Sequence, residues 1–293
     1  MSKNRQPSGE VNLTFCPFAS LPADYNVRVS KRLHVPIALT VAGSDSGGGA
    51  GIQADLKTFA SLGVHGTSAI TCITAQNPRR VRDIQPCSVE LVRRQLEAVF
   101  EELPPRAVKT GLLYSAPIIR AVAAFLGGRA GPPLVVDPVL VSTSGAPLLK
   151  PAALRSLLTE LLPLACLVMP NVHEAELLVG QRLRSVEDLR GAARALQGRL
   201  GCAALVKGGH LGRLAEAVDI FYDGRQELLL SAPFVRGVRT HGTGCTYSAA
   251  VTGYLARGLG LARAVRQAKE YITQAIAQSQ FAAGHAVLNS FWR

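Results

Sequence analysis

Short apolar segments alternate with amphipathic helical segments along most of this chain, and this order constrains the fold more than any other feature. The apolar segments are brief and rich in Val, Ile, Leu and Ala, which is typical of strands buried on both faces of a parallel sheet. They cover residues 36–43, 64–75, 106–110, 134–136, 167–169 and 203–207. The chain is therefore predicted to be an α/β protein with a mostly parallel central sheet and helices on both faces.

Helices are expected between these strands, and hairpins at two places. Ser88 and the pair Ser185 and Asp188 are typical N-terminal caps, and Pro151 suits the first turn of a helix. The expected helices cover residues 52–62, a segment capped by Ser88, 115–126, 151–162, 185–200, 244–257 and 261–281. Asp223-Gly224 predicts a hairpin, and residues 81–86 are expected to form a strand of a lid-like hairpin.

Length and composition favour one domain preceded by an extension. The chain has 293 residues and is 48% hydrophobic, enough for one large α/β domain or two smaller ones. No proline- or serine-rich linker and no internal repeat follows residue 36. We therefore expect a polar extension over residues 1–35, which lacks the apolar core of a secretory signal, and one domain over residues 36–293.

Charge, cysteines and hydropathy exclude several classes of protein. The formal net charge is +12, but the arginines are scattered, which indicates a solvated basic surface rather than a nucleic-acid site. The six cysteines form no CxxC pair, so neither a zinc site nor a disulfide framework is expected. No apolar run is long enough to span a membrane. A cytoplasmic protein in a reducing compartment is the simplest interpretation.

Two glycine-rich segments each lead into an expected helix. In the first, residues 44–51 follow a strand, but no GxGxxG or GxxxxGK[ST] pattern is present, which disfavours Rossmann and P-loop sites. In the second, Gly242 and Gly244 open a helix whose first N–H groups and dipole would favour a bound phosphate. Cys245 falls in the first turn, where a thiol pKa tends to drop. The alternative is an ordinary loop with a buried, inert cysteine.

Polar side chains follow the expected strands and would meet at one rim of the sheet. They are Asp45, Gln76, Lys109, Asp137, Asn171 with Glu174, and Lys207. Each alone could be a turn former, a helix cap or a surface charge. Together, two carboxylates with an Asn suit Mg²⁺, a lysine beside an anion-binding turn suits polyphosphate, and a glutamine amide can pair with a heterocycle edge.

Six motifs in order make a resemblance specific. They are AGSDSGGGAGIQADLKT (42–58), TAQN (74–77), VDPV (136–139), PNVHEA (170–175), VKGGH (206–210) and THGTGCT (240–246). Over residues 36 to 285 the chain resembles the hydroxymethylpyrimidine/phosphomethylpyrimidine kinases of thiamine biosynthesis, which are ribokinase-like. The resemblance implies ATP and Mg²⁺ as cofactors, a small-molecule pyrimidine substrate, and a homodimer.

The resemblance also implies roles for individual residues on the substrate side. The pyrimidine would be held by Gly43, Ala50, Gln76 and Val139, with Gln76 bonding its polar edge. Leu112 stands where a methionine often lines the pyrimidine pocket, and Thr143 stands where a lysine is common. Cys245 would be the base for the substrate hydroxyl.

On the nucleotide side, the family's anion hole for the transferred phosphoryl group matches Gly242, Thr243, Gly244 and Cys245. Asp137, Asn171 and Glu174 match the region that organises Mg²⁺ and the ATP phosphates, with Asp137 and Glu174 as the metal positions. Lys207 and Thr243 match further nucleotide-side positions.

These roles imply an enzyme that transfers the γ-phosphoryl group of ATP to 4-amino-5-hydroxymethyl-2-methylpyrimidine and then to its monophosphate. A pyridoxine or pyridoxal kinase is an alternative, because the chemistry is the same and the substrate similar. A non-catalytic pyrimidine-binding regulatory protein is a third reading. The intact turn at Gly242–Cys245, together with Asp137, Glu174 and Lys207, argues against a decayed site.

Overall fold

The structure is a computed structural model that describes residues 34–128, 131–140, 151–209, 211, 216–235, 238 and 241–292. Contacts divide the chain into two units, Met1–His34 and Val35–Arg293, and all described residues except His34 belong to the second. The extension expected over residues 1–35 lies outside the described residues, apart from its last two.

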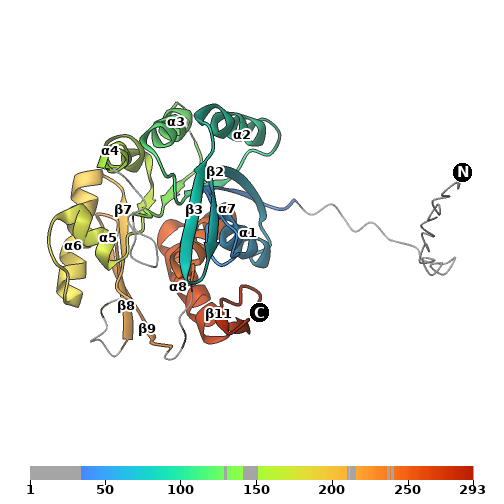
Figure 1. Cartoon of the computed structure of the whole chain (residues 1–293). Coiled ribbons are helices and arrows are strands. Elements are labelled where there is room, and N and C mark those ends of the chain that lie inside the picture. The colour runs from blue at the N-terminus through green and yellow to red at the C-terminus, as the bar shows by residue number, and fades with distance from the viewer. Residues whose placement is uncertain are drawn as a thin grey trace, which may run out of the picture. The chain divides into compact units, whose positions relative to one another are not determined.

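A nine-stranded sheet forms the centre of this unit, in the order β3-β2-β1-β4-β5-β6-β7-β8-β9 (Figure 1). The six strands from β2 to β7 in this order run parallel. At one edge β3 pairs antiparallel with β2, and at the other β8 pairs antiparallel with β7 and β9 with β8. This confirms the mostly parallel sheet. The strands are β1 (Ile37–Asp45), β2 (His65–Asn77), β3 (Arg80–Pro86), β4 (Ala107–Thr110), β5 (Leu134–Val136), β6 (Leu167–Val168), β7 (Ala203–Lys207), β8 (Glu216–Tyr222) and β9 (Glu227–Pro233).

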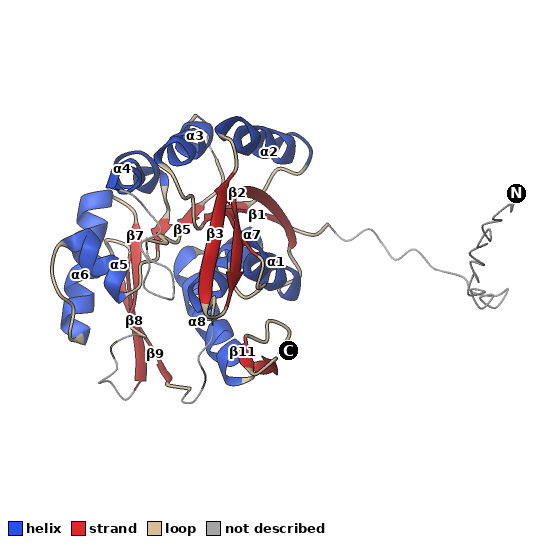
Figure 2. Cartoon of the chain, in the orientation of Figure 1, coloured by secondary structure: helices blue, strands red, loops and turns tan. Residues whose placement is uncertain are grey.

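Helices cover both faces of the sheet, as predicted (Figure 2). One face carries α1 (Gly51–Ser61), α7 (Thr243–Ala256) and α8 (Leu261–Ala277). The other carries α2 (Val89–Glu102), α3 (Ala116–Gly127), α4 (Pro151–Ser156), α5 (Val172–Val179) and α6 (Val186–Leu200). Successive strand residues enter the two cores alternately: in β5, Leu134 and Val136 join one and Val135 the other.

The expected caps and hairpins are present. Ser88 Oγ accepts a hydrogen bond from the Leu91 N–H at 3.2 Å. Ser185 and Asp188 exchange both bonds of a capping box, which starts α6. Strand β3 pairs antiparallel with β2, and β9 pairs with β8 across the turn that contains Asp223 and Gly224. Each of these elements was encoded by residues close together in sequence.

The helix expected over residues 151–162 is not continuous. It consists of α4, a π-helical segment Leu157–Leu161 and a 3₁₀ segment Leu162–Leu164. The Leu162 N–H bonds to the Leu157 carbonyl five residues back, and Pro163 has no N–H with which to continue an α-helix. Pro163 is thus the physical reason that the regular helix stops early.

Three elements were not predicted: helix α5 and the strands β10 (Gln280–Ala282) and β11 (His285–Val287). Helix α5 begins at a capping box between Asn171 and Glu174, a pattern that the sequence displays. Strands β10 and β11 pair with each other, so helix α8 ends at Ala277 rather than at residue 281.

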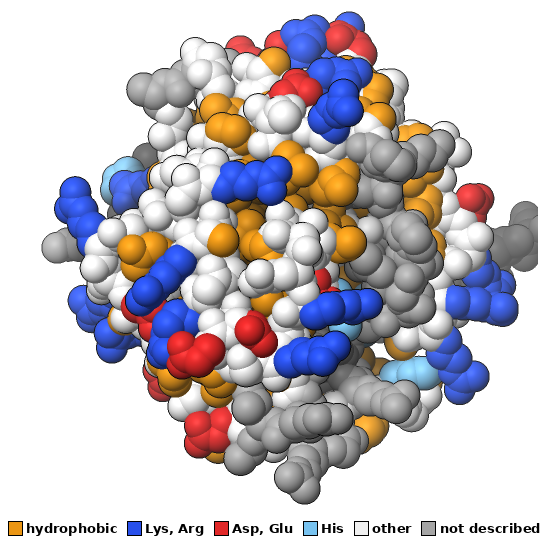
Figure 3. Space-filling view, turned by 90° about the vertical axis from the view of Figure 1, so that its left-hand side faces the viewer, with side chains coloured by type: hydrophobic (Ala, Val, Ile, Leu, Met, Phe, Trp, Pro, Cys, Tyr) orange, Lys and Arg blue, Asp and Glu red, His pale blue; other side chains and the backbone are white. Residues whose placement is uncertain are grey.

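The surface carries its positive charge in separate places. On the face shown in Figure 3, lysine and arginine side chains form several small groups that are separated from one another, some beside acidic side chains. Arg94 pairs with Glu90 at 2.8 Å and Arg194 with Glu227 at 3.1 Å, for example. Within the described part of the chain, no helix is long and apolar enough to cross a bilayer.

Candidate active site

A cavity of about 1380 Å³ opens at the carboxyl ends of the parallel strands. Among the described residues, all those proposed from the sequence for the site line this cavity: Gly43, Ala50, Gln76, Leu112, Asp137, Val139, Asn171, Glu174, Lys207, Gly242, Thr243, Gly244 and Cys245. The volume exceeds the roughly 300–1,000 Å³ of a typical small-molecule pocket. The cavity therefore has room for two ligands at once.

The turn before α7 has the geometry of an anion site. Gly242 is the N-cap residue with φ of +82°, and a Cβ there would lie 1.8 Å from the Gly49 carbonyl oxygen. Only glycine fits, because of both the positive φ and this close approach. The first helical bond runs from the Thr246 N–H to Gly242, so the amides of residues 243–245 belong to the helix start. Such amides favour a bound phosphate.

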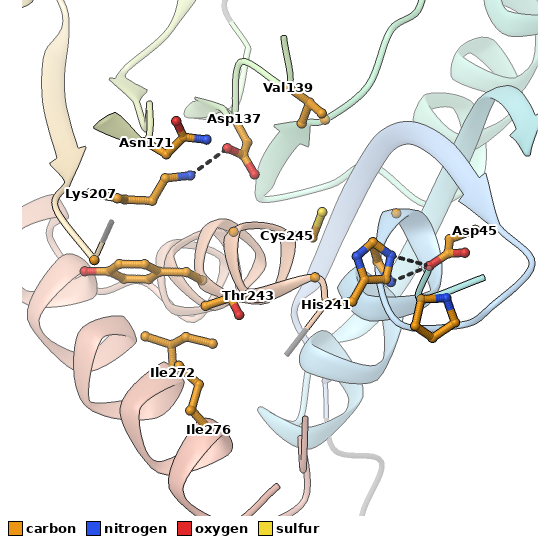
Figure 4. A pocket seen from close by; sticks show the side chains of 18 of the residues that line it. Asp45, Asp137, Val139, Asn171, Lys207, His241, Thr243, Cys245, Ile272 and Ile276 are labelled. Carbon is orange, nitrogen blue, oxygen red and sulfur yellow. Dashed lines mark hydrogen bonds and ion pairs between the residues drawn. The ribbon is translucent and has the colours of Figure 1, made fainter. Parts of the chain in front are cut away.

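Gly244 opens this turn toward a buried ion pair. A Cβ on Gly244 would lie 3.3 Å from Lys207 Nζ and 3.6 Å from Asp137 Oδ2. Lys207 Nζ donates to Asp137 Oδ1 at 2.9 Å, and Ser248 Oγ donates to Asp137 Oδ2 at 3.1 Å. In the view of Figure 4, Cys245 lies between this ion pair and a second pair, His241 with Asp45. The start of α7, Lys207 and Asp137 thus face the same part of the cavity. Ser248 was not predicted.

Asn171 and Glu174 combine a local role with a place in this cluster. The Glu174 N–H donates to Asn171 Oδ1 at 3.0 Å, and the Asn171 N–H donates to Glu174 Oε2 at 2.9 Å. Burial, together with the nearby Asp137, raises the pKa of Glu174 to about 7, although Lys207 opposes this. Burial would lower the pKa of Lys207, but Asp137 and Glu174 outweigh it and the pKa is raised. Lys207 is therefore charged, and Glu174 titrates near neutrality.

The floor of the predicted pyrimidine pocket is closely packed. A Cβ on Gly43 would lie 2.8 Å from Cys72 Sγ and 3.6 Å from Leu112 Cδ2. Ala50 is buried beside it, at the start of α1. A flat ring could lie over Gly43, whereas any side chain at that position would displace Cys72.

Gln76 is tied to His241, which was not predicted as a site residue, and through it to Asp45, which was expected at the same rim. His241 Nε2 lies 2.9 Å from Gln76 Nε2 and 3.1 Å from Asp45 Oδ2. Asp45 in turn accepts the N–H groups of Gly47 at 2.8 Å and Ala50 at 2.8 Å, so it shapes the first glycine loop. Burial would raise the pKa of Asp45, but the bonds from His241, Ala50 and Gly47 outweigh it and the pKa is lowered. His241 lies inside the THGTGCT motif, which was the available signal.

The hydrogen-bond network orients the Gln76 amide. Thr74 Oγ1 lies 2.9 Å from the Ser44 carbonyl oxygen and 3.2 Å from Gln76 Oε1, but a hydroxyl has one proton to donate. The contacts balance when the oxygen and nitrogen of the amide are exchanged. The Gln76 NH₂ group then donates to Thr74, and the His241 Nε2–H is shared between Asp45 and the Gln76 oxygen.

Cys245 departs from expectation in its ionisation. Burial raises the pKa of its thiol to about 11. Lys109 and the backbone N–H of Gly51 favour the thiolate, whereas the carboxylates of Asp55 and Asp137 oppose it. The expectation of a lowered pKa at the helix start was therefore wrong, because desolvation outweighs the helix terminus.

Lys109 lines the cavity with the other strand-end residues, as predicted, but its side chain is fully buried. Its Nζ donates to both carboxylate oxygens of Asp55 at 2.8 Å. Lys109 is thus committed to an internal ion pair. His210 and Thr240 of the motifs, and Thr143, lie outside the described residues.

This fold and this cavity define the ribokinase-like class of small-molecule kinases. The crystal structure of an ADP complex of Bacillus subtilis pyridoxal kinase superposes with a TM-score of 0.81 and 36% identity, over 88% of this chain and 98% of that one. A phosphomethylpyrimidine kinase structure from Clostridium difficile 630 gives a TM-score of 0.73 and 43% identity, over 82% of this chain and 99% of that one.

The particular family follows from the sequence comparisons. A family model described as phosphomethylpyrimidine kinase matches residues 45–289. The hydroxymethylpyrimidine/phosphomethylpyrimidine kinase of Streptomyces coelicolor is 50% identical over 241 residues, which cover 82% of this chain and 88% of the relative. This chain belongs to the phosphomethylpyrimidine kinase family.

Proposed function

We propose that this chain transfers the γ-phosphoryl group of ATP to the hydroxymethyl group of 4-amino-5-hydroxymethyl-2-methylpyrimidine, and then to the resulting monophosphate. One observation carries the proposal. The polar Gln76, the turn at Gly242–Cys245 and the Lys207–Asp137 pair all face one cavity large enough for both substrates. The names of the curated relatives, which include both pyrimidine substrates, support it.

In the proposed reaction the protein positions groups and neutralises charge, which is what phosphoryl transfer requires. The amides of residues 243–245 would bind the transferred phosphoryl group, and Lys207 would contribute a positive charge beside it. Apolar side chains at the other end of the cavity would hold the adenine; they are Ala217, Ala232, Val235, Val238, Ile272 and Ile276. Gln76 would hold the pyrimidine edge, so that its hydroxymethyl group points at Cys245.

The residues present fit a Mg²⁺ ion that is bound mainly through phosphates. Among the described residues, no group of three His, Cys, Asp or Glu side chains is arranged to hold a metal ion alone. Asp137 and Glu174 are two buried carboxylates beside one lysine, and Mg²⁺ usually takes one or two carboxylates, waters and substrate phosphates. We propose Asp137 and Glu174 as its protein ligands, directly or through water; the ion would neutralise phosphate charge.

A pyridoxal kinase is the second candidate, and the structural similarity to the Bacillus subtilis enzyme favours it. ATP consumption with the hydroxymethylpyrimidine, its monophosphate and pyridoxal as separate acceptors distinguishes the candidates. We expect kcat/KM to be highest with the pyrimidines. A preference for pyridoxal would replace our proposal, and no turnover with any acceptor would indicate a binding protein.

We also propose that the protein is a homodimer, as the family resemblance implies, and that it lies in the cytoplasm, as the cysteine pattern indicates. Light scattering should give a mass about twice the 31.0 kDa of one chain. A mass near that of one chain would contradict the dimer, and fractionation of the source cells tests the location.

A further inference from the structure

His241 connects three parts of the site, and the proposed reaction gives it no role. It immediately precedes Gly242 in the turn before α7, and its ring points toward Asp45 in the first glycine-rich segment (Figure 4). His241 Nε2 lies 3.1 Å from Asp45 Oδ2 and 2.9 Å from the Gln76 side-chain amide. The His241 side chain is 15% exposed and that of Asp45 is 3% exposed, so water competes little for these contacts.

Asp45 determines that this nitrogen carries a hydrogen. Its Oδ1 accepts the Gly47 N–H at 2.8 Å. Its Oδ2 accepts the N–H groups of Gly49 at 3.1 Å and Ala50 at 2.8 Å. Both lone pairs of Oδ2 are therefore occupied by donors, which leaves no place for a carboxyl proton on that oxygen. His241 must be the donor in its contact with Asp45, so the hydrogen of this contact is on Nε2.

The hydrogen on His241 Nε2 fixes the orientation of the Gln76 amide. A ring nitrogen that carries a hydrogen has no lone pair with which to accept another. The amide atom of Gln76 that lies 2.9 Å away is therefore the oxygen, and the NH₂ group faces Thr74 Oγ1 at 3.2 Å. Thr74 accepts this bond, because its own proton goes to the Ser44 carbonyl oxygen at 2.9 Å. Asp45, His241 and Thr74 thus all favour one orientation.

This orientation decides what the amide offers to a ligand. A primary amide has two lone pairs on its oxygen and two N–H donors. One lone pair of Gln76 faces His241 and one N–H faces Thr74, which leaves one lone pair and one N–H at the cavity. These two match an amino group beside an unprotonated ring nitrogen. A carbonyl beside a ring N–H presents the opposite pattern and would require the amide to turn over.

We propose that His241, held by Asp45, is a positioning residue that makes the site prefer a 4-amino over a 4-oxo pyrimidine by fixing the Gln76 amide. The proposal rests on the proposed function and deepens it, because it names the heterocycle edge that the site selects. The ring of His241 is itself closely packed, since a Cβ on Gly49 would lie 3.0 Å from its Cδ2. A 4-oxo ring that turned over to match the amide would carry its hydroxymethyl group away from Cys245.

The test compares two acceptors that differ only at this edge, 4-amino-5-hydroxymethyl-2-methylpyrimidine and its 4-oxo analogue. The ratio of their kcat/KM values measures the preference. The wild type should favour the amino compound on the order of 10²-fold, because the mismatched edge leaves polar groups unpaired. In His241→Leu no donor holds the amide oxygen, so the amide can turn over and the ratio should fall about tenfold. KM for ATP should be unchanged.

A conservative variant and a matched control separate positioning from general damage. In His241→Gln the new NH₂ group can donate to both Asp45 and Gln76, so the ratio should return most of the way to the wild-type value. His173 also lines the cavity, but its side chain is 67% exposed and its Nδ1 lies 3.8 Å from Glu176 Oε2. His173→Leu should therefore leave the ratio unchanged. General damage to the site would lower both kcat/KM values without changing their ratio.

The outcomes are distinct from those of the proposed function. If His241→Leu does not fold, Thr74→Val replaces it: valine keeps the shape but cannot accept from the Gln76 NH₂ group, so the ratio should again fall. A folded variant with the wild-type ratio overturns this proposal, as does a wild type that uses both acceptors equally well. Absence of turnover with either pyrimidine contradicts the proposed function, and this proposal with it.

Discussion

Cys245 offers two separable contributions, a sulfur that could accept a proton and a backbone N–H at the anion turn. Truncation to Cys245→Ala removes only the first. Positioned proton transfer is worth roughly 10²–10⁴-fold, so we expect kcat to fall by that order with little change in ATP affinity. Steady-state kinetics with saturating pyrimidine measures it, and Cys245→Asp should retain activity because a carboxylate can serve as the base.

The raised thiol pKa refines what to expect of this variant. A thiol with a pKa of about 11 is protonated at neutral pH, so alkylation of the resting enzyme should be slow and should accelerate with pH. Bound pyrimidine should protect it. If Cys245→Ala has a kcat near the wild-type value, the base role fails, and the backbone of the turn is the catalytic feature.

Gln76→Leu should weaken pyrimidine binding. Leucine cannot pair with the polar edge of the heterocycle, and an unpaired group there costs ~1–3 kcal/mol. His241 keeps its contact with Asp45 in this variant, so the glycine loop should stay in place. We expect KM for the pyrimidine to rise by roughly one to two orders of magnitude, with KM for ATP unchanged. The reverse pattern would mean that Gln76 belongs to the nucleotide pocket.

The raised pKa of Glu174 predicts that the stability of the folded protein depends on pH. Its pKa of about 7 in the folded state lies above the ordinary value of 4.5, so the folded state binds this proton more tightly than the unfolded state does. Its contribution to stability is present below pH 4.5 and is lost as the pH rises through 7, by up to about 3 kcal/mol.

Denaturant unfolding in magnesium-free buffer, compared between wild type and Glu174→Gln, tests this. Glutamine also suits the capping box but does not titrate, so the variant should lack this loss of stability. Parallel pH curves for the two proteins would show that Glu174 ionises normally.

Individual side chains differ in how well the sequence predicts them. Gln76, Asp137 and Lys207 were found because each ends a recognisable strand. The partnership of His241 with Asp45 joins residues 196 positions apart, and that of Lys109 with Asp55 joins residues 54 apart. No local pattern encodes such pairs. Burial of Cys245 likewise depends on the packing of α7 against neighbouring elements, so its raised pKa could not be predicted from its place in one helix.

The start of α7 depends on a glycine that no other residue can replace. In Gly242→Ala the new Cβ would meet the Gly49 carbonyl oxygen at 1.8 Å, so the turn or the first glycine loop must move. Displacing the amides that bind the phosphoryl group should lower kcat on the order of 10²-fold or more. Initial-rate kinetics and a thermal melt measure the two effects.

Gly258, just after the other end of α7, provides the matched control. It also has a positive φ, +88°, but a Cβ there meets no atom within 4 Å. Gly258→Ala should therefore cost only about 1–2 kcal/mol of backbone strain and leave kcat unchanged. Equal loss of kcat in both variants would mean that the turn at Gly242 has no special part in catalysis.

Elements were predicted best where a cap or an apolar stripe lies within one segment. Helix α6 follows from Ser185 and Asp188, and the buried stripe of α8 from Ala264, Ala268 and Tyr271. The break after α4 was missed because apolar periodicity continues through Leu157 to Leu162 while Pro163 removes the N–H of the next turn. The pairing of β10 with β11 is weakly encoded, since all of its residues are at least partly exposed.

The order of strands in the whole sheet was not derivable from local patterns, although its parallel character was. Alternating strands and helices require parallel neighbours, but the position of β1 between β2 and β4 depends on which hydrophobic faces pack together. The family resemblance implied a ribokinase-like fold, and no strand order was predicted from it. Both routes place the carboxyl ends of the strands at one rim, which is why so many predicted residues line one cavity.

The whole chain gives the last prediction, that deleting residues 1–34 leaves folding and turnover largely intact. The family match begins at residue 45, and the unit Val35–Arg293 keeps all of its own contacts. A chain that starts at Val35 retains the Pro36 carbonyl that accepts the His65 N–H at 2.8 Å, where β1 and β2 begin. Thermal melting and kcat/KM for the pyrimidine should therefore match the full-length protein.

A deeper deletion shows that the assay can detect damage. Removing residues 1–40 takes away Ala38 and Leu39, which are buried on opposite faces of the sheet, and Thr40, which binds Asp55. Loss of these central strand residues should abolish cooperative unfolding, because β1 pairs with both β2 and β4. If the shorter deletion also precipitates or loses most of its activity, residues 1–34 pack on the kinase domain, and the boundary drawn near residue 35 is wrong.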